Sequence, residues 1–423
     1  MEEHQVQESQ QIAVCVGMDW SDGTNEYSLQ GSGSVNVQDG TVKQAAESLM
    51  EWIQDLRKQF PEGKIAIALE QSRGALVHFL QQFDFLILYL INPLTLSEFR
   101  KAFRVSGAKD DPGDAGLLMK LIFLHRDKFR AWLPDDPGTR TLANLVELRR
   151  VMVDQRTALT NRMTSYLKMY YPQALLLAGD LSCPMACDFL KKWPTLDSLK
   201  KARIQSIKDF YYRHNSRSAK LMEQRLDLIR NAVPITSDPA LLNTYSLAVC
   251  GLANQVLEIN KSIDQFDLQI EKLYSQHPDY HLIDALPGAG PVVGPRILAA
   301  LGSDRSRYDL AKDIQQYSGV APITKRSGKS ISISRRIARP KFICQTWIEF
   351  ALHSRAKSLW AEAYYQEQRH EGKGHYAATR ALAFKWIRIV FACWKTNQPY
   401  HEARYLAALI KRNSTLVPLI KTA

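Results

Sequence analysis

Residues 12–20 read Ile-Ala-Val-Cys-Val-Gly-Met-Asp-Trp, a short apolar run that ends in an acid. Such a run, followed by Ser-Asp-Gly-Thr at 21–24, is typical of a buried strand that leads into a turn. A second run of this type, Lys-Ile-Ala-Ile-Ala-Leu over 64–69, also stops beside an acid, Glu70. Active sites in α/β sheets usually lie at the ends of strands, so Asp19 and Glu70 are candidates for one site.

Further strand-like and helical stretches around these two runs predict that they belong to one domain. Strand-like stretches occur over 26–37 and 85–91, and helical spacing of apolar residues occurs over 45–60 and 74–82. The order strand, strand, strand, helix, strand, helix, strand, helix predicts an α/β layer domain with one strand-rich edge. We expect this domain to cover residues 12–135.

Two more acids lie where the next helix is expected to begin. Residues 109–115 read Lys-Asp-Asp-Pro-Gly-Asp-Ala, which places Asp111 and Asp114 three residues apart. Each acid alone is typical of a solvated surface. Together with Asp19 and Glu70, however, they form a set of carboxylates on rigid supports, and Mg²⁺ prefers oxygen ligands of this kind. Phosphodiester chemistry needs such a site, because bound metal stabilises the attacking and leaving oxygens.

The middle of the chain is helical. Apolar residues from Leu242 to Leu273 recur in steps of three and four over more than four heptads, which predicts a coiled-coil seam. Residues 136–280 therefore form a long helical hairpin, with a small helical insertion at about 171–240. The pattern leaves open whether the seam closes within one chain or between chains. We favour a homo-oligomer, a dimer or tetramer, joined through this hairpin.

Positive charge is concentrated in the C-terminal third of the chain. The 423 residues carry a net charge of +12, and residues 286–423 hold 23 Lys and Arg against 8 Asp and Glu. This imbalance points to a polyanionic partner such as nucleic acid. No apolar run approaches the roughly 20 residues of a membrane span. The N-terminus is not that of a signal peptide, and the six cysteines are scattered, so we expect a cytoplasmic protein without a membrane partner.

The last third, residues 281–400, reads as a mostly helical domain followed by a tail at 401–423. Its first feature is Leu-Pro-Gly-Ala-Gly over 286–290, between two short apolar helices, the signature of a helix-hairpin-helix. Gly288 and Gly290 would let backbone N–H groups approach a phosphate. Such glycines also occur for purely structural reasons, and the surrounding charge favours nucleic-acid contact.

A basic segment follows. Between residues 325 and 341 there are seven Lys or Arg and no acid. Ser327, flanked by a flexible glycine and by cations that can stabilise an alkoxide, is the preferred nucleophile. Ser330, Ser332 and Ser334 remain open alternatives, and a simple phosphate-contacting turn is the plainer reading. The side chains expected to contact nucleic acid are Lys325, Arg326, Lys329, Arg335, Arg336 and Arg339.

Together these motifs resemble the DEDD-type insertion-sequence transposases of the IS110 family, which includes bridge-RNA-guided recombinases and pilin-gene invertases. The resemblance rests on Val-Gly-Met-Asp at 16–19, the strand ending at Glu70, residues 109–115, Leu-Pro-Gly-Ala-Gly at 286–290, and Gly-Val-Ala-Pro at 319–322 leading to Ser327. Two departures are visible. Asp110 stands where the family usually has threonine, which leaves an ambiguity between Asp110 and Asp111, and 171–240 is longer than a simple connector.

The resemblance implies a RuvC-like ribonuclease-H fold, with Asp19, Glu70, Asp111 and Asp114 as Mg²⁺ ligands and Ser327 as the attacking residue. It implies DNA strand exchange through a covalent serine–DNA intermediate, in an oligomer that can combine acids and serine from different subunits. It further implies donor and target DNA and a structured non-coding guide RNA as partners, in a prokaryotic cytoplasm beside the nucleoid.

Three alternatives stand beside this interpretation. A Holliday-junction resolvase or other metal-dependent nuclease would use a similar acidic quartet with water as nucleophile. A DEDD exonuclease normally carries Asp-x-Glu on its first strand, and Asp-Trp-Ser at 19–21 lacks it. A non-enzymatic DNA- or RNA-binding protein would tolerate Asp19→Asn without loss of activity.

Overall fold

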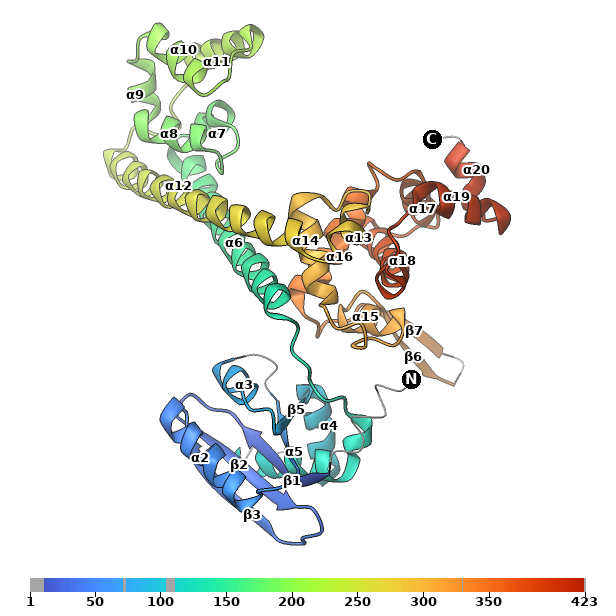
Figure 1. Ribbon diagram of the computed structural model, residues 1–423. Coiled ribbons are helices and arrows are strands. Elements are labelled where there is room, and N and C mark those ends of the chain that lie inside the picture. Colours follow the sequence, from blue (N-terminus) through green and yellow to red (C-terminus); the bar gives the residue numbers. More distant parts are fainter. Residues whose placement is uncertain (1–10, 71–73, 104–110, 329, 422–423) are drawn as a thin grey trace. The chain divides into compact units, whose positions relative to one another are not determined.

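The computed structural model describes residues 11–70, 74–103, 111–328 and 330–421. The chain divides into two compact units, Met1–Pro134 and Asp135–Ala423. The first is a mixed α/β unit and the second is almost entirely helical, as the sequence predicts (Figure 1).

The first unit is built on one five-stranded sheet. Its strands are β1 (Ile12–Asp19), β2 (Thr24–Gly31), β3 (Val37–Lys43), β4 (Lys64–Leu69) and β5 (Leu86–Leu90), in the spatial order β3-β2-β1-β4-β5. The first three strands form antiparallel pairs, whereas β4 is parallel to β1 and β5 is parallel to β4. The strand-rich edge expected from the sequence is the antiparallel part.

Helices cover both faces of this sheet. Alternate residues of a strand point to opposite faces, and Val14, Val16 and Met18 of β1 share a core with α2 (Ala46–Gln59) and α3 (Ala75–Leu80). Cys15 lies on the opposite face, with α4 (Pro93–Phe103) and α5 (Asp111–His125). A short 3-10 helix, Arg126–Lys128, follows α5.

Two long helices begin the second unit. The helices α6 (Pro137–Tyr170) and α12 (Pro239–Gln276) pack against each other within the chain. The buried side chains of α12 include Val249, Val256, Ile263 and Ile270, so the apolar stripe found in the sequence is its packing face. This helix is also apolar and long enough to cross a membrane, a property that core helices of soluble proteins share.

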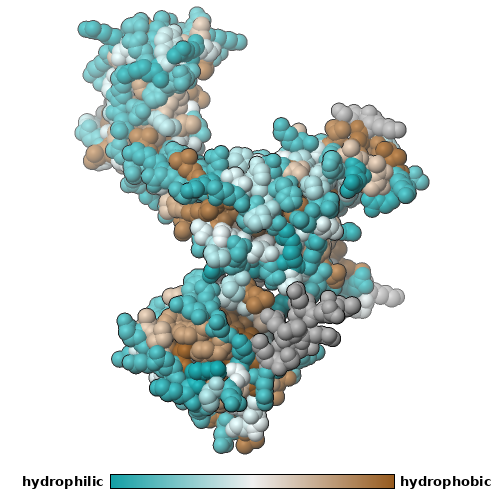
Figure 2. All heavy atoms as spheres, in the orientation of Figure 1, coloured by the Kyte–Doolittle hydropathy of each residue, from teal (hydrophilic) through white to brown (hydrophobic). Residues whose placement is uncertain are grey.

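Five short helices lie between α6 and α12 in the sequence. Their side chains Phe189, Trp193 and Phe210 pack in a core that also contains side chains of α6 and α12. Their surface is mostly hydrophilic (Figure 2). These helices are α7 (Gln173–Ala178), α8 (Pro184–Lys192), α9 (Leu196–Lys200), α10 (Ile204–Arg213) and α11 (Ala219–Asn231).

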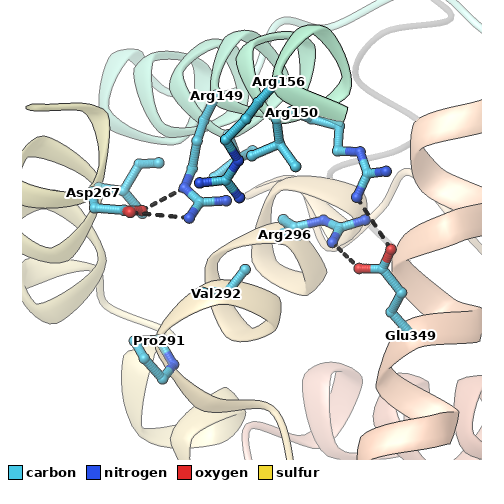
Figure 3. Close-up of a pocket in the computed structure, with 11 residues that line it drawn as sticks. Arg149, Arg150, Arg156, Asp267, Pro291, Val292, Arg296 and Glu349 are labelled. Carbon is cyan, nitrogen blue, oxygen red and sulfur yellow. Dashed lines mark hydrogen bonds and ion pairs between the residues drawn. The ribbon is translucent and has the colours of Figure 1, made fainter. Parts of the chain in front are cut away.

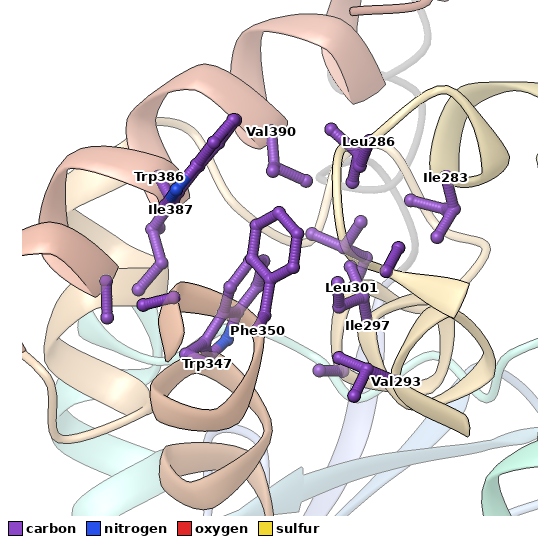
Figure 4. Packing of buried hydrophobic residues seen from close by; sticks show 14 of the residues in the cluster. Ile283, Leu286, Val293, Ile297, Leu301, Trp347, Phe350, Trp386, Ile387 and Val390 are labelled. Carbon is purple, nitrogen blue, oxygen red and sulfur yellow. The ribbon is translucent and has the colours of Figure 1, made fainter. Parts of the chain in front are cut away.

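The C-terminal part packs around the tryptophans of its long helices. Trp347, Trp360, Trp386 and Trp394 are all buried, and Figure 4 shows two of them beside apolar side chains of α14. The elements are α13 (Tyr280–Asp284), α14 (Gly290–Leu301), α15 (Ala311–Tyr317), β6 (Ile323–Ser327), β7 (Ser330–Ser334), α16 (Lys341–Ser354), α17 (Leu359–His370), α18 (His375–Thr396), α19 (Glu402–Lys411) and α20 (Leu416–Lys421).

Candidate active site

Two of the four predicted acids lie next to each other at the end of the central strands. In the parallel pairing of β1 and β4, Met18 is the partner of Leu69. Asp19 and Glu70 are the next residues of the two strands, and both are partly buried. Since Met18 belongs to the core under α2 and α3, the alternation of β1 places Asp19 on the other face, which α5 covers. Glu70 is the first residue after β4.

The start of α5 lies directly on this face. A Cβ atom at Gly17 would come within 2.1 Å of the Ala115 carbonyl oxygen and 2.3 Å of the Met119 nitrogen, so only glycine allows this approach. Asp114, one residue before Ala115, is completely buried. The glycine in Val-Gly-Met-Asp therefore brings the first turns of α5 against β1, two residues before Asp19.

Asp114 already has a cationic partner. Arg100 of α4 donates from Nε to one carboxylate oxygen at 2.9 Å and from Nη2 to the other. A buried carboxylate needs such compensation, because removing one partner of a buried ion pair leaves an unpaired charge in the interior. Arg100 was not among the residues found from the sequence, and only the packing of α4 on α5 reveals it.

The fourth predicted acid, Asp111, lies at the first position of α5. Its side chain is not among those described, and Asp110 lies outside the described residues.

A further acid, Glu26, lies opposite Asp19 in the antiparallel pairing of β1 and β2. Directly opposed residues share a face of the sheet, and like charges in this position repel each other. Glu26 thus adds negative charge to the face that holds Asp19. The sequence places Glu26 in a strand but does not reveal the register that opposes it to Asp19.

The donor chemistry of this face suits a hard cation. Its candidate ligands are carboxylates only, which matches the preference of Mg²⁺ for oxygen. Among the residues that the structure describes, no three His, Cys, Asp or Glu side chains are grouped closely enough to hold a metal ion, and Asp114 is engaged by Arg100.

Ser327 lies in the second unit, at the end of β6 in a two-stranded hairpin. Its pairing partner on β7 is Ser330, and Lys325 pairs with Ser332. Paired residues share a face, so Ser327, Ser330, Lys325 and Ser332 lie on one side of the hairpin. Ser327 is exposed.

The predicted cations around the hairpin differ in their contacts. Arg326 is opposite Ile331, on the face away from Ser327. Arg339 is turned inward, since its Nη1 donates to the Arg336 carbonyl and its side chain fills the space beside Gly319. Arg335 is exposed and Arg336 partly so, while Lys329 lies outside the described residues. Lys325 is exposed and lies on the same hairpin face as Ser327.

The two glycines of the connector before α14 have different surroundings. Gly288 has φ +84°, and a Cβ there would lie 2.6 Å from the carbonyl carbon of His353, so this glycine allows close packing on α16. Gly290 has φ +55°, and nothing lies within 4 Å of its Cβ position. Only Gly290 has open space for a ligand next to it.

Two family models match the chain. One, described as "Transposase" and belonging to the DEDD type of IS110, matches residues 16–172. The other, described as "Transposase IS116/IS110/IS902 family", matches residues 280–366. The chain belongs to the IS110 family of transposases. The first match contains the four predicted acids, and the second contains Gly288, Gly290 and Ser327.

Relatives of this IS110-family protein align over much of its length. It is 28% identical over 352 residues to the mini-circle putative transposase for IS117 of Streptomyces coelicolor. The aligned region covers 82% of this chain and 85% of that protein. It is 27% identical to the insertion element IS900 uncharacterized 42 kDa protein of Mycobacterium paratuberculosis, covering 62% and 67%. It is 24% identical to the insertion element IS110 uncharacterized 43.6 kDa protein of Streptomyces coelicolor, covering 71% and 74%.

Proposed function

We propose that this IS110-family transposase cleaves and rejoins DNA through a covalent serine–DNA intermediate, with Mg²⁺ held by Asp19, Glu70, Asp111 and Asp114. The observation that carries the proposal is the register of β1 and β4. It brings Asp19 and Glu70 together at neighbouring strand ends, beside the face where α5, the helix of Asp111 and Asp114, begins. The strand order β3-β2-β1-β4-β5 supports a RuvC-like ribonuclease-H fold for this unit.

The acids have a defined task in this reaction. Bound divalent metal supplies stabilisation of the negative charge that develops on the phosphate. Asp19 and Glu70 present oxygens from rigid strand ends, and Asp114 can turn from Arg100 to join them. Arg100 then becomes an available donor on the same face, and the negative charge of Glu26 increases the attraction for a cation.

The hydroxyl of Ser327 supplies the nucleophile. Its Oγ forms a bond to phosphorus while the bond between phosphorus and one DNA oxygen breaks, and the hydroxyl proton ends on the departing oxygen. The lysine on the same hairpin face, Lys325, stabilises the charge on the phosphate. The reverse reaction with the hydroxyl of another DNA strand releases the serine and completes strand exchange.

The nucleic-acid partners follow from charge and from the family resemblance. We propose that donor and target DNA bind to the basic C-terminal part and that a structured non-coding RNA guides the choice of sequence. In such an arrangement the protein contacts backbone and shape, while base pairing reads the sequence. We further propose that the chain acts as a homo-oligomer, with α6 and α12 as the joining hairpin in a coiled-coil arrangement.

The test is capture of the covalent intermediate. End-labelled DNA carrying the ends of the element is incubated with protein, RNA and Mg²⁺, and a denaturing gel reports protein-linked DNA. Ser327→Ala should abolish the adduct, whereas Ser330→Ala, which removes the neighbouring hydroxyl, should keep it. Asp19→Asn should lose cleavage while DNA binding persists. Full cleavage by Ser327→Ala would instead favour water as nucleophile, as in a resolvase.

A further inference from the structure

A cavity of about 180 Å³ lies where α6, α12, α14 and α16 meet (Figure 3). Four arginines line it, together with two carboxylates: Arg149, Arg150, Arg156, Arg296, Asp267 and Glu349. This cavity is below the roughly 300–1,000 Å³ of pockets that hold drug-sized ligands. Its size suits one small group, and its lining carries more positive than negative charge.

The arginines keep unused donors after their pairing with the carboxylates. Arg149 donates to both oxygens of Asp267, and Arg150 and Arg296 share Glu349. Arg150 also pairs through Nη2 with Asp154 of α6 at 2.7 Å. A guanidinium has five N–H donors in a fixed fork, so a single carboxylate leaves part of it available. The surplus of guanidinium groups over carboxylates in the lining is the charge pattern of a site for an anion.

Arg296 provides an observation that a structural ion-pair network does not explain. The residue is only 4% exposed. Its Nε donates to the Thr346 hydroxyl at 3.2 Å and its Nη1 donates to Glu349. Its Nη2 is buried and has no hydrogen-bond partner among the described residues, and the same holds for Nε of Arg150. Buried polar groups in native proteins are almost always hydrogen-bonded, so these donors indicate a missing acceptor.

The N-terminus of α14 adds to this site. Pro291 and Val292, in the first turn, line the cavity. Pro291 has no N–H, and the N–H groups of Val293 and Gly294 donate to the Ala289 carbonyl, which leaves the N–H of Val292 at the cavity. The helix dipole favours an anion there. The space beside Gly290 is open. The cavity therefore joins guanidinium donors to a helix N-terminus, both of which bind phosphate.

We propose that this cavity binds one backbone phosphate of the nucleic acid that the transposase carries. The proposal rests on the proposed function, which supplies nucleic acid as the partner. It assigns new ligands, Arg149, Arg150, Arg156 and Arg296, outside both the acid set and the serine hairpin. It also places the Gly290 connector at the edge of a defined phosphate site.

Variants at the cavity entrance test the proposal without removing a buried arginine. Val292 lines the cavity and is 43% exposed. Val292→Glu adds a negative charge at a helix start, where an acid does not destabilise the helix. Val292→Gln is the neutral control of similar size. Arg156, which donates to Asn260 at 2.8 Å, is changed to Gln, with Arg156→Lys as the variant that retains the charge.

The measurement is fluorescence anisotropy of a labelled DNA duplex and a labelled RNA hairpin over a range of salt concentrations. Val292→Glu and Arg156→Gln should weaken binding about tenfold, the loss of one charged hydrogen bond. The slope of log affinity against log salt for the duplex should fall by about 0.9, the value for one phosphate. Val292→Gln and the distant Arg230→Gln, an exposed residue paired with Asp227, should match the wild type. Arg156→Lys keeps the charge but loses the forked donors, so it should retain the salt slope while its affinity falls.

Other outcomes overturn the proposal. Equal affinity and slope in all variants would mean that the arginines only join the helices. A thermal shift with inorganic phosphate that Arg156→Gln abolishes, without any change in nucleic-acid affinity, would identify free phosphate as the occupant. Failure of the wild type to bind either nucleic acid would instead contradict the proposed function, so the two failures are distinguishable.

Discussion

In the proposed function, the ion pair of Arg100 with Asp114 links Mg²⁺ binding to the stability of the first unit. Arg100 is 19% exposed and Asp114 is completely buried, and two hydrogen bonds join them. Arg100→Gln removes the positive charge and leaves Asp114 as an uncompensated buried carboxylate. We expect the variant without Mg²⁺ to be strongly destabilised, and Mg²⁺ to restore much of the loss by taking the place of the guanidinium.

The size of the stability loss in Arg100→Gln follows from how deeply Asp114 and Arg100 are buried. Breaking a buried ion pair by removing one partner costs about 3–5 kcal/mol, and the partial exposure of Arg100 favours the lower end. For a unit the size of Met1–Pro134, about 3 kcal/mol lowers the melting temperature by roughly 9–15 °C. Saturating Mg²⁺ at about 100 times its Kd returns about 2.7 kcal/mol. The variant should therefore respond to Mg²⁺ more strongly than the wild type, in which Arg100 competes for Asp114.

The assay has to report on the first unit alone. Hydrogen exchange of peptides from residues 12–19 and 64–69, with and without Mg²⁺, follows the two strands that end at the acids. Arg355→Gln is the matched control, because it breaks an equally bidentate pair with Glu362 in the second unit. The double variant Arg100→Gln with Asp114→Asn should recover stability without metal. The reasoning is refuted if Mg²⁺ leaves the Arg100→Gln variant unchanged, or if Asp114→Asn does not rescue it.

Three further predictions concern packing and pH. Gly17→Ala should cost about 3 kcal/mol, measured by urea unfolding, because its Cβ would collide with the backbone of α5. Gly288→Ala should cost about 2–5 kcal/mol, from a collision with α16 and a positive φ, whereas Gly290→Ala should cost only about 1–2 kcal/mol; equal costs would contradict the two environments. Burial raises the pKa of Asp136, but hydrogen bonds from Thr139 outweigh this and lower the pKa from 3.8 to about 2. The stabilisation is therefore complete above about pH 4 and lost as pH falls towards 2, so Asp136→Asn should flatten the stability profile in that range.

The local signals in the sequence were sufficient for the elements of the first unit. Apolar runs that end in acids predict β1 and β4, whereas the parallel pairing of the two strands comes from the structure. The helical stripe of α12 is confirmed as a packing face. Its partner within the chain is α6, which the sequence pattern left open. Periodicity shows which face of a helix is buried but not which element covers it.

The site depends on contacts that the sequence does not encode locally. Arg100 is fourteen residues from Asp114, and nothing in the spacing selects it over the neighbouring Lys101. Glu26 gains its significance only from the antiparallel register with β1. Gly288 shows the converse, because a motif that suggested phosphate contact is explained by close packing on α16. In each case the decisive fact is a pairing between elements.

The acid face and the arginine cavity differ in how the chain balances their charges without ligand. On the acid face the carboxylate of Asp114, which is completely buried, is neutralised by Arg100. In the cavity, burial lowers the pKa of Arg296 while Glu349 opposes this effect, and one of its donors remains without an acceptor. Binding of a cation at the first site exchanges one ion pair for another. Binding of a phosphate at the second adds an interaction that is missing, so nucleic acid should stabilise the second unit more than Mg²⁺ stabilises the wild-type first unit.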